Sequence, residues 1–286
     1  MKKALLVGIN KYQGSPLRGC VNDVLVVFQI LTEKFKFKHS DIKVLTDYEA
    51  TRANIIDGIK WLTTGVGDGD SILFHYSGHG SQINVSDWTS SDEADGLDEI
   101  IIQVDMDWNK PIRDNELGMY FKRVPKSCNT TVVLDSCHSG TCLRNGFGPL
   151  ENNTENDYVN RFISPPVSNI LTNPSLIIKD DLSFDFPDPA VDSRAIRSKF
   201  LVDTVDQGDA ILIAGCMENQ TSADAWINKR YQGAMTYALA KTLNDHNFNI
   251  TYKDLVTKMN VLMKKFKFTQ VPQLECKDEL MNKLFL

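Results

Sequence analysis

Short apolar runs alternate with amphipathic stretches along the first part of the chain. The runs are rich in β-branched residues, as buried strands are, and the stretches between them place apolar residues at helical spacing. This alternation predicts βαβ units and a mostly parallel sheet with right-handed crossovers. The strands are expected at residues 3–9, 42–46 and 71–76, and the helices at residues 19–31 and 51–62.

The pattern continues to residue 135, fails, and returns near the C-terminus. Residues 144–207 show no sustained periodicity and hold six of the ten prolines. An insertion this long without secondary structure is usually functional or disordered. The remaining elements are expected as strands at 99–104, 130–135, 209–216 and 271–276, and as helices at 114–120, 233–243 and 252–266.

These elements predict an α/β protein in three parts. Residues 1–143 would supply most of the sheet, residues 144–207 an irregular linker, and residues 208–286 the rest of the same sheet. The predicted sheet has about six strands, mainly parallel, and the intervening helices should cover both of its faces.

Composition adds exclusions to this picture. Hydrophobic residues make up 42% of the chain, charged residues 24%, and the net charge is −6, so nucleic acid and anionic membrane surfaces are not expected partners. No apolar segment approaches the roughly 20 residues of a membrane span, and the N-terminal apolar run is too short for a signal peptide. Six cysteines without a CxxC pair favour reduced thiols and a cytoplasmic location.

Two of the predicted strands end in matching polar, glycine-containing turns. Strand 71–76 runs into a turn that carries His79, and strand 130–135 runs into one that carries Cys137. The carboxyl ends of parallel strands meet at one edge of a sheet, where ligands bind. A thiolate is the nucleophilic form of cysteine and needs a neighbouring base, which predicts a Cys–His pair. The alternative is a buried, unreactive Cys137 and an ordinary loop histidine.

Five short motifs resemble the signature blocks of the metacaspases, a family of caspase-like cysteine peptidases. The resemblance spans both ends of the chain and implies a caspase-like three-layer sandwich with a p20-like part (1–143) and a p10-like part (208–286). The motifs are GCVND at 19–23, HYSGHG at 75–80, DSCHSG at 135–140, QTSAD at 220–224 and PQL at 272–274. The sequence RFISPP at 161–166 and the compact length resemble the bacterial members, the orthocaspases.

The resemblance implies a His–Cys dyad. His79 would help to generate the thiolate of Cys137 and protonate the leaving amine, and the amides of Gly80 and Cys137 would hold the oxyanion. The same scaffold could instead carry a different thiol hydrolase, or a catalytically silent dyad in a regulatory or scaffold protein.

Metacaspases cut after Arg or Lys, and the sequence offers a physical basis for that preference. Asp23, Asp135 and Ser77 match the residues that line the family's S1 pocket, where carboxylates hold the cationic P1 side chain. Asp135 and Ser77 each lie two residues before a dyad member, so in extended chain they share its face. The alternative is that Asp23 favours a helix start and Asp135 caps a turn.

The acidic stretch that follows His79 raises the question of calcium. Asp95, Asp98 and Asp114 are candidate oxygen ligands. However, Arg144 stands where the family's calcium site would place an acid, so calcium is not expected to be required and no other cofactor is implied. A solvated acidic loop is the alternative.

The linker carries basic residues that an Arg/Lys-directed peptidase could cut. Loops are preferred nicking sites, so autoprocessing is expected there unless the chain stays intact. The resemblance also favours a monomer that acts on protein or peptide substrates. The candidate cleavage residues are Lys179, Arg194, Arg197 and Lys199.

Overall fold

The computed structural model describes residues 1–84, 97–137, 158–165, 209–217 and 220–286. The first part of the chain alternates strands and helices as its hydrophobic pattern predicts. Its main elements are β1 (Lys2–Gly8), α1 (Cys20–Gln29), β2 (Ile42–Thr46), α2 (Arg52–Thr63), β3 (Ser71–Ser77), α3 (Asp114–Phe121) and β7 (Asn129–Asp135).

Within the described residues, six strands form one central sheet in the order β12-β9-β7-β3-β1-β2. All neighbours are parallel except β12, which runs antiparallel to β9 at the edge. The predicted edge position of this last strand is therefore correct, which fits Pro272 just before it. The C-terminal elements are β9 (Ala210–Ala214), α6 (Ala234–Asp245), α7 (Tyr252–Lys265) and β12 (Gln273–Glu275).

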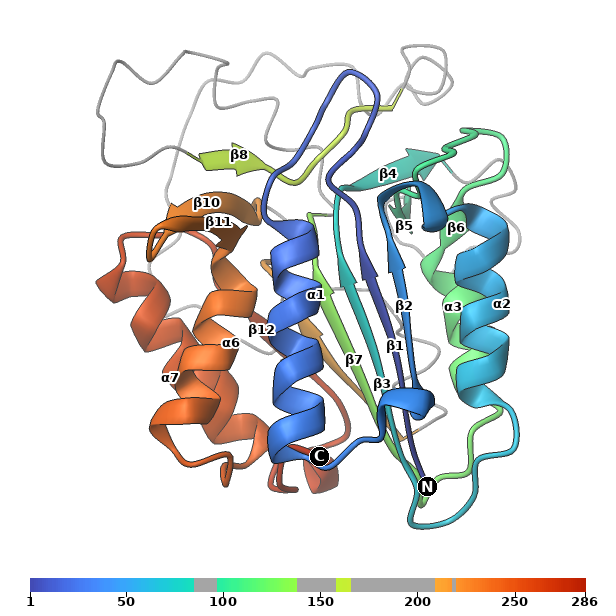
Figure 1. Ribbon diagram of the computed structural model, residues 1–286, viewed down its shortest axis with the longest axis vertical. Coiled ribbons are helices and arrows are strands. Elements are labelled where there is room, and N and C mark those ends of the chain that lie inside the picture. The colour runs from blue at the N-terminus through green and yellow to red at the C-terminus, as the bar shows by residue number, and fades with distance from the viewer. Residues whose placement is uncertain (85–96, 138–157, 166–208, 218–219) are drawn as a thin grey trace.

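The sheet lies between two helical layers (Figure 1). Alternate β3 residues face opposite sides, so Leu73 packs in the core with α1, α6 and α7, whereas Ile72 and Phe74 pack in the core with α2 and α3. The predicted α/β sandwich, with a mostly parallel six-stranded sheet and helices on both faces, is confirmed. None of the helices in the described parts of the chain is both long and apolar enough to cross a bilayer.

Two small antiparallel sheets lie beyond the carboxyl ends of the parallel strands, at the top of Figure 1. The hydrophobic pattern missed most of their strands, which are short, and placed the strand of Leu97–Ile101 at residues 99–104. One sheet contains β4 (Gly80–Asn84), β5 (Leu97–Ile101) and β6 (Ile112–Arg113), and the other contains β8 (Tyr158–Asn160), β10 (Ala223–Ile227) and β11 (Arg230–Gly233).

Strand β8 corrects one expectation about the linker. Residues 144–207 were expected to be irregular throughout, but Tyr158–Asn160 pairs antiparallel with β10. A three-residue strand is too short for a periodicity of two to be visible in the sequence. Its backbone bonds to β10 come from tertiary structure, and they bring part of the linker to the carboxyl edge of the sheet.

Candidate active site

The ends of β3 and β7 bring His79 and Cys137 to the same edge of the sheet. Ser77 and Asp135 are paired in the parallel register, so His79 and Cys137 each lie two residues beyond a paired position. The amides of Gly80 and Cys137 donate to one shared acceptor, the carbonyl oxygen of Arg161, at 3.0 and 3.2 Å. The predicted oxyanion donors therefore converge on a single point.

The His79 ring is held in one orientation. Its Nε2 lies 2.8 Å from the carbonyl oxygen of Ser15, and the ring packs against Tyr12 at a centroid distance of 4.6 Å. A carbonyl can only accept, so Nε2 carries the proton and Nδ1 keeps its lone pair. Nδ1 is buried and makes no hydrogen bond of acceptable geometry among the described residues, although the backbone of Arg161 lies close enough to oppose the lowering of the His79 pKa. Nδ1 is available as a proton acceptor.

Burial sets the charge state of this histidine. Desolvation lowers the pKa of His79 to about 4, and the positive charge of Arg161 also lowers it, although a hydrogen bond to Ser15 opposes the shift. The imidazole is therefore neutral at physiological pH. Cys137 is also buried, and its Sγ accepts the amide N–H of Ser222 at 2.6 Å.

A second thiol lies beside Cys137. A hydrogen bond to Cys137, together with burial, raises the pKa of the Cys216 thiol well above its usual value. Cys216 also donates to the carbonyl oxygen of Gln220 at 3.3 Å. The Cys216 thiol therefore stays protonated.

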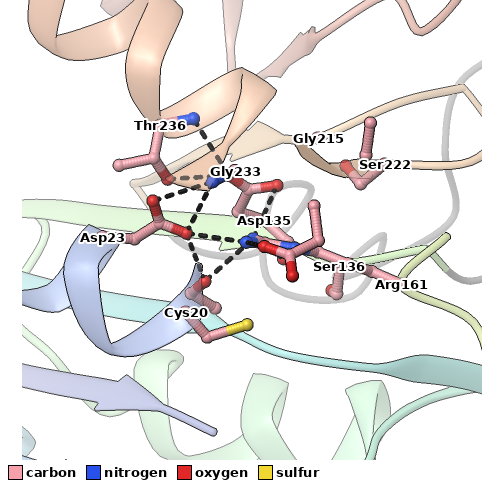
Figure 2. Close-up of polar contacts among 12 residues, drawn as sticks. Cys20, Asp23, Asp135, Ser136, Arg161, Gly215, Ser222, Gly233 and Thr236 are labelled. Atoms are coloured by element: carbon pink, nitrogen blue, oxygen red, sulfur yellow. Dashed lines mark hydrogen bonds and ion pairs between the residues drawn. The ribbon is translucent and has the colours of Figure 1, made fainter. Parts of the chain in front are cut away.

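The predicted pocket residues surround a guanidinium (Figure 2). Arg161 is fully buried, and its Nη2 lies 2.8 Å from Oδ2 of Asp23, while its Nη1 lies 3.2 Å from Oδ1 of Asp135 and 2.8 Å from Oγ of Ser77. Asp224 contributes a third carboxylate at 3.1 Å from Nη2. The structure thus joins Asp23, Asp135 and Ser77 in one site and adds an acid that sequence reasoning left unassigned.

Backbone amides fix the acids in place. The first turn of α6 directs its N-terminus at Asp135, whose Oδ2 accepts from the amide and the hydroxyl of Thr236 at 2.9 and 2.7 Å. Asp23 accepts the amide of Gly233 at 2.9 Å, and Asp224 accepts the amide of Arg18 at 2.6 Å. The pocket is preorganised for a cation.

Gly233 forms a wall of this pocket. A Cβ added there would come within 2.6 Å of Nη1 of Arg161 and 2.8 Å of Oδ2 of Asp23. It would also overlap Oδ2 of Asp135, so only a glycine leaves room for the guanidinium and the carboxylates of Asp23 and Asp135. Neither Gly233 nor Arg161 was identified from the sequence as a pocket residue.

Negative charge exceeds positive charge in the pocket. Burial raises the pKa of Asp23 to about 7, and repulsion by Asp135 adds to this, while Arg161 opposes the shift. Three carboxylates share one guanidinium. A cation bound in the pocket favours the deprotonated, negatively charged forms of these carboxylates. The pocket therefore favours a positively charged side chain.

Of the predicted metal residues, Asp98 and Asp114 lie within the described ranges, and both have partners in the protein. Asp98 forms an ion pair with Arg113 at 2.7 Å, and Oδ1 of Asp114 accepts the amide of Asn115. Within the described ranges, three or more His, Cys, Asp or Glu side chains nowhere gather as metal ligands would. The predicted residues outside the described ranges are Asp95, Arg144, Lys179, Arg194, Arg197 and Lys199.

Three comparisons with known proteins place the chain in a family and a fold. A family model described as the metacaspase, peptidase C14 domain matches residues 2–145. Metacaspase-1 of Scheffersomyces stipitis is 35% identical over 294 residues, which cover 96% of this chain and 70% of that protein. Metacaspase-1 of Pyricularia oryzae is 32% identical, with 98% and 72% covered. A crystal structure of a protein from Geobacter sulfurreducens is similar in fold, with a TM-score of 0.65 at 23% identity, covering 99% of this chain and 97% of that one.

Proposed function

The chain belongs to the metacaspase family of peptidase C14 and is a cysteine peptidase, and from this premise we propose that it cuts polypeptides after Arg or Lys with a His79–Cys137 dyad. One observation carries the proposal. A guanidinium is held by three buried carboxylates while the carbonyl oxygen of the same residue accepts the amides of Gly80 and Cys137. A P1 arginine needs both contacts at once.

The proposed chemistry follows from the orientation of His79. Nδ1 takes the proton of the Cys137 thiol, and Sγ attacks the carbonyl carbon of the P1 residue. The negative oxygen that develops is stabilised by the two amides that converge at this point. The peptide C–N bond then breaks as His79 returns the proton to the leaving amine, and water hydrolyses the thioester.

The low pKa of His79 suits the first of these steps. A histidine with a pKa of about 4 is neutral throughout the physiological range and can accept the thiol proton. Activity should be lost in acid, as His79 takes up a proton and its Nδ1 lone pair is no longer available.

Specificity for Arg and Lys rests on the charge of the pocket. A buried carboxylate without a cation is unfavourable, and losing one partner of a buried charge pair costs about 2–5 kcal/mol. Neutral or acidic P1 side chains would leave Asp23, Asp135 and Asp224 uncompensated. The pocket should therefore accept Arg and Lys and reject Asp.

We propose further that calcium is not required. Asp98 is already paired with Arg113, and Arg144 is a cation at the position where the resemblance expects an acidic ligand. Addition of a calcium chelator should therefore leave the turnover of an Arg peptide unchanged.

A panel of fluorogenic peptides with Arg, Lys or Asp at P1, assayed with and without calcium, tests the function. We expect turnover of the Arg and Lys peptides only, and none in a Cys137→Ala variant. An Asp135→Asn variant should lose at least about 100-fold in kcat/KM for Arg, roughly 3 kcal/mol. Asp57→Asn is a matched control, because Asp57 is exposed on α2.

The possible outcomes separate the parts of the proposal. Cleavage after Asp would contradict the S1 assignment alone. The catalytic proposal would be contradicted if protein whose pocket is free of Arg161 turned over no peptide. That result would favour a silent regulatory or scaffold protein.

A further inference from the structure

We propose that residues Tyr158–Ile163 are bound in the active site as the protein's own substrate, and that Arg161–Phe162 is the bond it cuts. The inference rests on the proposed function, and it names a cleavage site that differs from the linker residues predicted from sequence. It also implies that the uncut chain blocks its own S1 pocket.

The side chain of Arg161 is the first observation. Strand β8 before it is exposed, whereas Arg161 itself has 0% exposure. Its guanidinium reaches Asp23, Asp135, Asp224 and Ser77. One buried residue directly after an exposed strand is what a P1 anchor requires.

The backbone of Arg161 is the second and independent observation. Its N–H donates to the carbonyl oxygen of Ser222 at 3.0 Å, and its carbonyl oxygen accepts from Gly80 and Cys137 at 3.0 and 3.2 Å. A purely structural arginine would need only the acids. It would have no need of a carbonyl held by the amide of the proposed nucleophile.

The flanking residues continue the same pattern on both sides. Asn160 and Tyr158 pair antiparallel with Ala223 and Ala225 of β10, and the hydroxyl of Thr221 donates to Oδ1 of Asn160 at 3.0 Å. Beyond Arg161, the amide of Ile163 donates to the carbonyl oxygen of Gly80 at 3.1 Å. Extended peptides commonly bind by adding a strand to a sheet edge in this way.

The bond that breaks follows from these contacts. Sγ of Cys137 would attack the carbonyl carbon of Arg161, the C–N bond to Phe162 would break, and His79 would pass the thiol proton to the new amine of Phe162. Water then releases the carboxylate of Arg161 and restores the thiol. One water molecule is consumed, and the products are residues 1–161 and 162–286.

The burial of Arg161 makes its cleavage intramolecular, and this cleavage should precede the turnover of external peptides. Arg161 is inaccessible to a second molecule, so the rate of cutting should not depend on protein concentration. While Arg161 fills the pocket, an external P1 residue cannot enter, and apparent affinity falls with the fraction of competent enzyme. Once the chain is cut, the described contacts that retain the new C-terminus are the short β8 ladder, the hydrogen bonds of Asn160 and of the Arg161 backbone, and the guanidinium contacts.

Intact-mass and N-terminal analysis of the full chain test the proposal. We expect wild type to yield a new N-terminus at Phe162, and a Cys137→Ala variant to remain uncut there. A variant with Lys179→Gln, Arg194→Gln, Arg197→Gln and Lys199→Gln together should still be cut at Arg161. Arg161→Lys should also be cut, since it keeps the charge that the buried acids need.

Phe162→Pro provides an uncut form with Arg161 in place. The amide of Phe162 makes no hydrogen bond among the described residues, and a proline keeps the preceding residue extended. We expect this variant to stay uncut and to turn over Arg peptides at least about tenfold more slowly than cut wild type. Equal turnover by uncut Phe162→Pro and cut wild type would overturn the blockade.

Three further outcomes separate the inference, its intramolecular route and the function on which it rests. Wild type that turns over Arg peptides while its Arg161–Phe162 bond stays intact would overturn the inference and leave the proposed function standing. Wild type can also be added to the Cys137→Ala protein. If it cuts that protein at Arg161 as fast as it cuts itself, the intramolecular route is overturned. If neither the chain nor any peptide is cut, the proposed function itself fails.

Discussion

Single residues decide what the proposed S1 pocket can hold. Asp23, Asp135 and Asp224 are each almost fully buried, and the bound guanidinium supplies their positive charge. Removing the cation would leave buried negative charges without compensation, which is strongly unfavourable. Arg161 therefore stabilises the uncut fold as well as filling the pocket, and an incoming Arg or Lys would take over that role.

Gly233 should set the size limit of the pocket. We expect Gly233→Ala to raise KM for an Arg peptide at least about tenfold, because the added Cβ meets Nη1 and a carboxylate oxygen. The loss should be smaller for a Lys peptide, since an ammonium lacks the second nitrogen of the guanidinium fork. Steady-state kinetics on processed protein measure both effects.

Gly67→Ala is the matched control for this substitution. An added Cβ at Gly67 has no heavy atom within 4 Å, and the residue is not in the left-handed region. Its kinetics should equal those of wild type. A Gly233→Ala variant with unchanged KM for both peptides would show that the pocket wall has been wrongly assigned.

At the scale of elements, β3 and the turn that follows it carry two buried histidines with different surroundings. His79, beyond its end, is oriented by Ser15 and Tyr12, whereas His75, within it, faces apolar side chains of α1 and α6. Neither ring nitrogen of His75 has a hydrogen-bond partner among the described residues. An unpaired buried polar group destabilises a fold by about 1–3 kcal/mol.

His75 should make the fold sensitive to acid. Burial lowers its pKa to about 4, below the usual value near 6.5, so the unfolded chain takes up a proton first as pH falls. The stability linked to His75 is therefore full above about pH 6.5 and is lost between pH 6.5 and 4, by about 2 kcal/mol at pH 5. We expect His75→Leu to remove this loss and to raise stability at pH 7.

Urea unfolding of the uncut Cys137→Ala protein at pH 5 and pH 7 measures the effect. His39→Gln serves as the control, because His39 is exposed at the surface. If His75→Leu and His39→Gln show the same difference between the two pH values, the acid sensitivity does not come from His75.

At the scale of the whole molecule, the two parts of the chain share one sheet. Strand β9 lies between β7 and β12, so a strand from after the linker is paired with one from before it. Helices α6 and α7 pack in the same core as α1. The proposed cut between Arg161 and Phe162 crosses none of these contacts.

The two fragments should therefore remain together after cleavage. We expect residues 1–161 and 162–286 to elute as one species in gel filtration and to separate only in denaturant, because separation would expose the β7–β9 edge and the shared core. Gel filtration of cut wild type beside uncut Cys137→Ala tests this. Elution of free fragments under native conditions would contradict it.

The sequence by itself determined the main sheet, its helical layers and the residues at the strand ends. These features are local, since the periodicity of two or 3.6 appears in consecutive residues and the polar turns at His79 and Cys137 directly follow apolar runs. Asp23, Asp135 and Ser77 were also found, through motifs of a few residues each. Strand β8 was missed because three residues are too few to show a period.

Only the tertiary structure decided what fills the pocket. Arg161 lies 138 positions from Asp23 and 63 from Asp224, so no local pattern relates them. Arg161 is buried by two tertiary contacts: β8 pairs with β10, and α6 approaches the ends of β3 and β7. In the sequence Arg161 belongs to the RFISPP motif, but nothing local indicates its burial. Tertiary contacts bring three acids and two amides around it, and this arrangement supports the proposed P1 role.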